Sequence, residues 1–168
     1  NALSGLDQAL WDIKGKRANM PVYQLLGGKC RFGIETIARG NGSTPEEVAD
    51  NVLKQMEAGY RYFRLGAAGL PESKAPFQAA GFGKPTDEYI DDLGTLKALV
   101  KTFEVVRKRC GDEVLIGTDL HEKFQPIDTI QFCKQIEQYG PISFIEDPLS
   151  PENTGWWKQM RASTTVPF

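Results

Sequence analysis

The sequence predicts an α/β fold in which parallel strands alternate with helices, as in a parallel sheet or a barrel. Two short apolar runs, residues 114–118 and 142–145, have the length and composition of buried strands. Between them, residues 126–139 carry the apolar spacing of a helix. A strand, a helix and a second strand form a βαβ unit, so we expect the two strands to be parallel and adjacent.

Earlier segments extend this alternation. Apolar residues at helical spacing predict a helix over about residues 2–16, and Pro21 starts a short turn that ends at residues 27–28. Residues 32–38 are predicted to form a strand. The next helix has a strong start at residues 43–47, where a Ser or Thr cap, a first-turn Pro and two acids suit the positive end of the helix dipole.

The middle of the chain repeats the pattern with one long interruption. Gly59 is a plausible end for that helix, and residues 60–65 are predicted to form the next strand. Residues 66–85 form a loop rich in Gly, Ala and Pro, and loops of this length often act as lids or binding loops. A helix is then predicted from about residue 86 to Cys110.

The two ends of the chain have the pattern of an internal piece of a longer protein. Asn1 is not an initiator Met, and it begins directly in a helical pattern. A last helix is predicted over about residues 153–161, and residues 166–168 resemble the start of a further strand.

The composition is that of an ordinary globular protein with one domain and a substantial core, at 168 residues, 40% hydrophobic and 25% charged. A net charge of −2 without a long basic run gives no support to nucleic-acid or anionic-membrane binding. The apolar stretches are too short to span a bilayer. Three widely spaced cysteines predict reduced thiols in a cytoplasmic protein: Cys30, Cys110 and Cys133.

Two carboxylates follow the strands of the βαβ unit. Asp119 ends the first apolar run, and Glu146 ends the second. Because adjacent strands lie about 4.8 Å apart, both acids could ligate one hard cation such as Mg²⁺. His121 lies two residues after Asp119, and its side chain points to the same side if strand geometry persists there. A metal carboxylate beside a proton donor suggests chemistry as well as packing.

Cationic and amide side chains follow the two earlier strands. Arg39 and Asn41 follow the first strand, and Arg64 ends the second. In a (β/α) barrel these ends converge on one mouth, where cations, acids and a His would suit a metal-bound anionic substrate. Each residue type also has a structural alternative: an acid in a turn or at the surface, a hydrogen-bonded His, or an Arg that is solvated or paired with acids.

Several segments resemble the enolase superfamily. Residues 4–16 resemble the helix that leads into its barrel, residues 21–28 fit as well, and residues 146–148 resemble its second metal-ligand strand end. Residues 119–124 resemble the Asp-x-His turn of mannonate dehydratase-like acid-sugar dehydratases. The resemblance implies a partial (β/α) TIM-type barrel with parallel strands, in which residues 1–168 form the N-terminal part of the barrel domain without the capping domain or the later strands.

The resemblance also implies an Mg²⁺-dependent lyase, which dehydrates a mannonate- or gluconate-like acid sugar to a 2-keto-3-deoxy sugar acid. The full-length protein is expected to be a homo-oligomer, whereas this piece alone is expected to be inactive, with open sheet edges. The family's third metal acid would lie beyond the last residue of this chain. The implied site comprises metal ligands Asp119 and Glu146, catalytic His121 and Arg64, and substrate-binding Arg39 and Asn41.

Departures from the family pattern leave a second hypothesis open. Arg39 stands where mannonate dehydratases usually have a His, and the loop after Arg64 has Phe77 and Phe82 but no Tyr before Tyr89. The alternative function is therefore a non-catalytic member that binds sugar acids or acts in regulation. The second strand also lacks the paired Lys of racemases, which argues against mandelate-racemase or muconate-cycloisomerase chemistry.

Overall fold

The computed structural model describes residues 2–68 and 91–168. They fall into two compact units, residues 1–35 and residues 36–168. The predicted start of a helix near residue 86, most of the loop predicted over residues 66–85, and Tyr89 lie outside the described residues.

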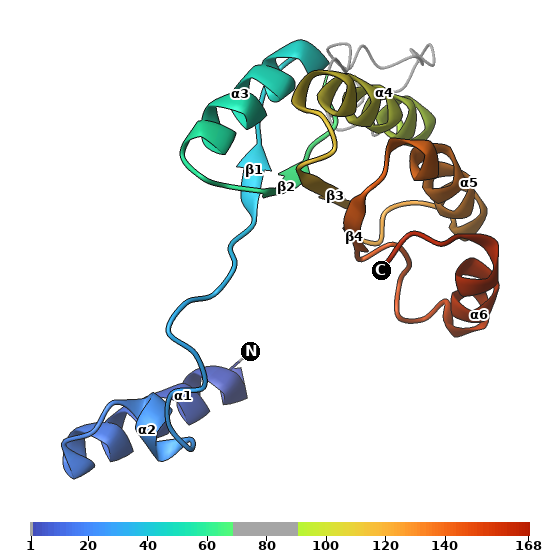
Figure 1. The fold of residues 1–168 in the computed structure, drawn as a ribbon. Coiled ribbons are helices and arrows are strands. Elements are labelled where there is room, and N and C mark those ends of the chain that lie inside the picture. The colour runs from blue at the N-terminus through green and yellow to red at the C-terminus, as the bar shows by residue number, and fades with distance from the viewer. Residues whose placement is uncertain (1, 69–90) are drawn as a thin grey trace, which may run out of the picture. The chain divides into compact units, whose positions relative to one another are not determined.

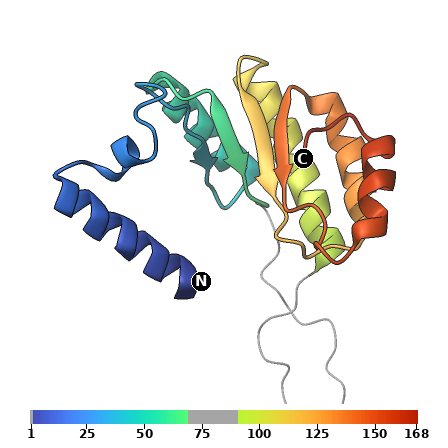
Figure 2. The same cartoon turned by 90° about the horizontal axis from the view of Figure 1, so that it is seen from below.

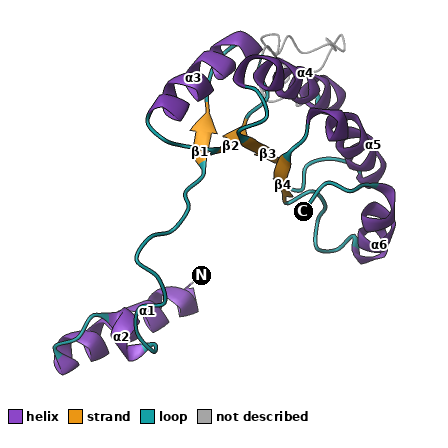
Figure 3. Cartoon of the chain, viewed as in Figure 1, coloured by secondary structure: helices purple, strands orange, loops and turns teal. Residues whose placement is uncertain are grey.

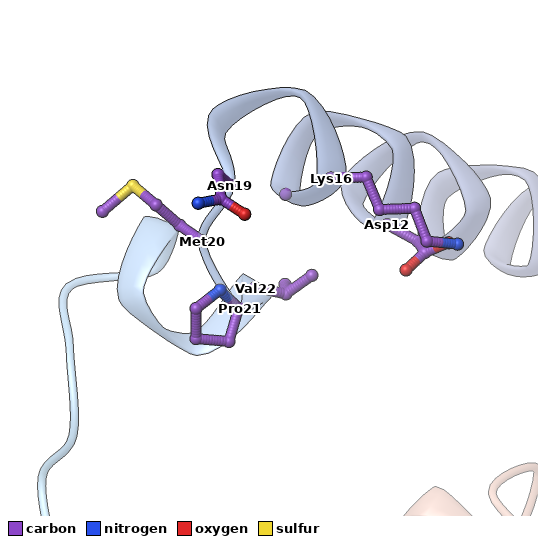
Figure 4. Close-up of a pocket in the computed structure, with 7 residues that line it drawn as sticks. Asp12, Lys16, Asn19, Met20, Pro21 and Val22 are labelled. Atoms are coloured by element: carbon purple, nitrogen blue, oxygen red, sulfur yellow. The ribbon is translucent and has the colours of Figure 1, made fainter.

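The first unit consists of helices α1 (Ala2–Ala18) and α2 (Val22–Leu25), in agreement with the predicted helix and short turn. Gly15 allows the chain to fold back, since a Cβ there would lie 2.9 Å from the Met20 carbonyl oxygen. A hollow of about 360 Å³ lies at this turn, with the Asp12–Lys16 ion pair on its rim (Figure 4). The apolar residues that predicted α1 are exposed: Leu3, Leu6, Leu10 and Ile13.

The second unit alternates strands and helices as predicted, in a single four-stranded sheet (Figure 3). The elements are β1 (Ala38–Gly40), α3 (Pro45–Glu57), β2 (Tyr62–Leu65), α4 (Asp92–Cys110), β3 (Leu115–Asp119), α5 (Pro126–Ile136), η1 (Glu137–Tyr139), β4 (Ile142–Glu146) and α6 (Thr154–Ser163). The 3₁₀ turn η1 extends α5, so that the two together cover the helix predicted over residues 126–139.

The strand predicted over residues 32–38 is wrong. β1 begins at Ala38, which is the first residue of this segment to pair with β2, opposite Phe63. Phe32 and Ile34 are 97% and 76% exposed. Their alternation had the pattern of a strand, but no neighbouring strand among the described residues pairs with them.

The start of α3 was predicted from its residues and is confirmed. Thr44 accepts a hydrogen bond from the Glu47 N–H at 3.2 Å, and Pro45 occupies the first turn. The Glu47 carboxylate in turn accepts from the Ser43 N–H at 2.8 Å, which satisfies a second free donor. Gly59, with φ of +97°, lies just beyond the helix end.

All four strands are parallel in the order β1-β2-β3-β4, and α3 to α6 cover one face of the sheet (Figures 1 and 2). Neighbouring helices pack on one another along the layer. Phe103 of α4 and Phe132 of α5 meet edge to face, with ring centroids 6.2 Å apart. Alternate strand residues such as Phe63 and Ile116 are buried in this core. The intervening residues therefore project from the opposite face of the sheet.

The last residues of the chain lie beside β4. The Ile145 N–H donates to the Pro167 carbonyl at 2.9 Å, as a neighbouring strand would accept it. The Glu137 carboxylate accepts from the Thr164 hydroxyl at 2.6 Å and the Thr165 N–H at 2.7 Å. These hydrogen bonds favour the charged carboxylate and lower the pKa of Glu137.

The three cysteines are free thiols, as predicted. Cys30 is exposed, whereas Cys110 and Cys133 are buried, and burial raises the pKa of Cys133 to about 12. None of the described helices has both the length and the apolar character needed to cross a membrane.

A register shift between β3 and β4 decides which residues lie opposite each other at their C-terminal ends. Ile116 pairs with Ile142, but Thr118 pairs with Ile145 and Asp119 with Glu146, so β4 gains one residue between these pairs. Gly117 lies at the shift. A Cβ on Gly117 would be 2.3 Å from the Phe144 carbonyl oxygen, so only glycine allows this approach.

We predict that Gly117→Ala lowers the free energy of unfolding of the full-length protein by about 3 kcal/mol, because the added methyl must displace β4 backbone. Gly155→Ala in α6 is the matched control, since its Cβ would meet no atom within 4 Å. That control should gain about 0.5–1 kcal/mol from helix propensity. Urea unfolding of both variants measures the difference, and equal stability of wild type and Gly117→Ala would refute the steric account.

Candidate active site

Three of the predicted site residues meet at the C-terminal ends of β2, β3 and β4. One nitrogen of Arg64, Nη1, donates to Asp119 Oδ2 and to Glu146 Oε2, each at 2.8 Å. Their side chains are 24%, 9% and 42% exposed, so the cluster is partly open to solvent, mostly at Glu146. The alternative that Arg64 pairs with acids is thus confirmed, and its partners are the two acids predicted to bind a metal.

The register shift at Gly117 explains why both acids are within reach of one atom. Because of the shift, Asp119 lies directly opposite Glu146. With the pairing of Ile116 and Ile142 continued unchanged, Asp119 would oppose Ile145, and Glu146 would lie one residue out of line. The geometry of the cluster therefore depends on a glycine two residues before the first acid.

His121 joins the cluster, but not by the predicted route. Strand geometry does not persist to this residue, because β3 ends at Asp119 and His121 has a φ of +53°. The turned backbone brings the ring back, so that His121 Nε2 lies 2.7 Å from Asp119 Oδ2. The His121 N–H also donates to Asp119 Oδ1 at 3.1 Å. The ring is 58% exposed, so solvent or a small molecule can reach it.

The turns after β3 and β4 hold left-handed backbone at residues that rarely adopt it. Glu122 and Asp147 have φ of +60° and +43°. The two turns are joined by backbone hydrogen bonds, from the Leu120 N–H to the Glu146 carbonyl at 3.0 Å and from the Glu122 N–H to the Asp147 carbonyl at 2.9 Å. We infer that these bonds stabilise the strained turn that orients His121.

Arg39 and Asn41 lie at the edge of the same site. Together with Arg64, Asp119 and His121 they line a hollow of about 160 Å³. Arg39 is directly opposite Arg64 in the sheet, so both guanidinium groups belong to the face away from the helices. The described residues provide no ion-pair partner for the Arg39 side chain.

Two residues on α3 that the sequence did not single out hold this edge of the hollow. The Asn51 side chain accepts from the Asn41 N–H at 3.1 Å. The Gln55 amide donates to the Arg39 carbonyl at 2.8 Å and to Asn51 Oδ1 at 2.7 Å. The only sequence signal was two amides four residues apart on one helix face, which is too common to identify a role.

The two acids fit a hard cation as part of its ligand set. Their oxygens converge on a single cationic nitrogen, and carboxylate oxygens are the ligands that Mg²⁺ prefers. Within residues 2–68 and 91–168, no group of three or more His, Cys, Asp or Glu side chains is placed to hold a metal ion. The described residues thus offer two carboxylates at this place, and a complete site requires ligands besides them.

Comparison with known proteins identifies the family. Residues 47–168 match the family model described as enolase C-terminal domain-like. The chain belongs to this family. Residues 1–27 match the N-terminal domain of mandelate racemase and muconate lactonizing enzyme. The predicted superfamily and its partial barrel of parallel strands are therefore confirmed. The assignment of all 168 residues to the barrel domain stays a prediction.

Two relatives are named as members of the D-galactonate dehydratase family, and one similar solved structure is named an enolase. A D-galactonate dehydratase family member from Enterocloster bolteae is 39% identical over all of this chain and 42% of its own length. Another from Pantoea ananatis is 38% identical over all of this chain and 44% of its own. A crystal structure of a Pantoea ananatis enolase with bound D-gluconate and Mg is 35% identical, with a TM-score of 0.81 over 96% of this chain and 42% of that one. The chain thus spans less than half the length of these relatives.

We predict that Glu122→Gly raises the free energy of unfolding of the full-length protein by up to about 1 kcal/mol, because glycine adopts this backbone without the left-handed penalty. Glu113→Gly is the control. That exposed residue has no positive φ, so glycine there should only cost stability. Thermal unfolding compares the two, and a loss of stability in both would show that position 122 is not strained.

Proposed function

We propose that the full-length protein is an Mg²⁺-dependent dehydratase that converts a gluconate-, galactonate- or mannonate-like acid sugar to a 2-keto-3-deoxy sugar acid. The observation that carries the proposal is the convergence of Asp119 and Glu146 on one cationic atom, with His121 Nε2 2.7 Å from the first acid. The dehydratase names of the relatives, and the gluconate and Mg bound to a similar structure, support this reaction class.

Asp119 and Glu146 are the residues that would hold Mg²⁺. When bound, this ion would stabilise the second negative charge that develops on the substrate carboxylate as the α-proton leaves. The nearly buried Asp119 and the half-exposed Glu146 are fixed by the β3–β4 pairing, so neither needs a large rearrangement to act as a ligand.

His121 is proposed as the general acid. Loss of a β-hydroxyl group requires a proton, and the His121 imidazole can donate one so that the group leaves as water. Its Nε2 atom lies 2.7 Å from Asp119 Oδ2, which orients the ring beside the metal acids, and the 58% exposure of the side chain leaves the ring open to the hollow. The enol that remains then becomes the 2-keto acid by tautomerisation.

Arg39 and Arg64 are proposed to orient the anionic substrate. Arg64 also assists His121, which in this proposal takes the α-proton as a base and returns it to the leaving hydroxyl group. A planar guanidinium binds a carboxylate through two parallel hydrogen bonds, which fixes its orientation as well as its charge. Arg39 has no ion pair among the described residues and lines the hollow with Asn41, so this edge is suited to substrate binding.

The proposal is tested by assaying 2-keto acid formation by the full-length protein with Mg²⁺ across a panel of hexonates and pentonates. Product from one or a few acids would support the dehydratase function. Binding of sugar acids without product would favour the alternative of a binding or regulatory protein. The motivation for this alternative is Arg39, which stands where the family usually has a His.

We predict that His121→Asn reduces turnover of the full-length protein by at least about 100-fold, because Asn cannot donate a proton in the same way. Mg²⁺ binding, measured by calorimetry, should persist since both carboxylates remain. Glu113→Gln, at the opposite end of β3, is the control and should retain turnover. Near-normal turnover of His121→Asn would rule out the assignment.

Three expectations for the whole protein stay predictions: that it is a cytoplasmic homo-oligomer, that a third metal acid lies beyond Phe168, and that residues 1–168 alone are inactive.

A further inference from the structure

Arg64 occupies the position that the proposed metal site requires. Its Nη1 atom contacts Asp119 Oδ2 and Glu146 Oε2 at 2.8 Å, so a positive group already lies between the two carboxylates. A divalent ion bound by the same oxygens would repel this guanidinium at short range. The two cations therefore compete for one pair of acids.

The contact between Arg64 and the acids is suited to exchange. The Arg64–Glu146 pair is open to water, with side chains 24% and 42% exposed, whereas Asp119 is only 9% exposed. A partly exposed ion pair contributes little net free energy, so a divalent ion has little to overcome at Glu146. A chain that is flexible at its tip, such as that of Arg, can rotate without any movement of β2.

The neighbouring hollow offers Arg64 a second position. Arg64 lines it together with Arg39, Asn41 and His121. Arg39 is opposite Arg64 in the sheet, so a released Arg64 would face the hollow beside a second guanidinium. Two guanidinium groups at one hollow form a binding site for a small carboxylate-bearing anion.

We propose that Arg64 is an internal counter-ion of the metal site, which the metal displaces toward the substrate hollow. The inference rests on the metal site of the proposed function. It gives an order of events: metal binding frees Arg64, and Arg64 then takes part in binding the anion. In the metal-free protein one guanidinium offsets part of the charge of the two acids, and the anion site is incomplete.

This competition lowers the apparent metal affinity. When a binding-competent state is only part of the population, the apparent Kd equals the intrinsic Kd divided by that fraction. If Arg64 holds the acids in about nine-tenths of the metal-free molecules, removal of the guanidinium should strengthen Mg²⁺ binding about tenfold.

The test is calorimetric titration of the full-length protein with Mg²⁺ alone. Arg64→Met should bind Mg²⁺ about tenfold more tightly than wild type. Arg39→Met is the matched control, because it removes the same charge from the adjacent strand. Its Mg²⁺ affinity should differ from that of wild type by no more than about twofold if Arg39 affects the metal only through general electrostatics. The proposal would be overturned if Arg64→Met binds Mg²⁺ no more tightly than wild type, or if Arg39→Met gains as much affinity as Arg64→Met. It would also be overturned if neither wild type nor Arg64→Met binds Mg²⁺.

Crystal structures of the wild-type full-length protein, in EDTA and in Mg²⁺, provide a second test that needs no variant. We expect the Arg64 contacts to both acids in EDTA and their loss in Mg²⁺. Retention of both contacts beside a bound ion, or their absence from both structures, would refute the exchange. These tests do not measure turnover. A tenfold gain in the Mg²⁺ affinity of Arg64→Met without 2-keto acid formation by wild type would support the exchange and reject the dehydratase function. Turnover by wild type with unchanged Mg²⁺ affinity of Arg64→Met would support the dehydratase function and reject the exchange.

Discussion

The close approach of β4 to Gly117 is the constraint on which the site depends. A Phe144 carbonyl occupies the space where any other residue would carry its Cβ, and β4 gains one residue at this point. That single-residue shift places Asp119 opposite Glu146 and so unites two acids from different strands. The geometry of the candidate site therefore depends on backbone packing two residues before Asp119.

Once the acids face each other, their charge has to be balanced. In the structure Arg64 provides a positive charge from β2, and His121 Nε2 lies 2.7 Å from Asp119 Oδ2. Two carboxylates this close repel each other without a cation between them. In the proposed metal site Arg64 thus occupies the place of the divalent ion, and the same residue lines the adjacent hollow.

Sequence reasoning predicted most of the elements because their signals are local. The Thr44–Pro45 helix start and the acids at the ends of two apolar runs needed only neighbouring residues. The features that sequence reasoning missed depend on contacts between distant parts of the chain. Residues 32–37 alternate like a strand but have no partner strand among the described residues. The register shift requires knowledge of the partner strand, and the left-handed turn at His121 occurs without the Gly or Asn that would have indicated it.

The most direct test of the central claim, that Asp119 and Glu146 share one cation, is Mg²⁺ titration of full-length Asp119→Asn and Glu146→Gln beside wild type. Loss of an outer partner of a metal ligand weakens binding by about 10–100-fold, so loss of either ligand should cost at least about 100-fold. Wild-type affinity in either variant would contradict the shared site. It would show that the carboxylate pair serves only to hold Arg64.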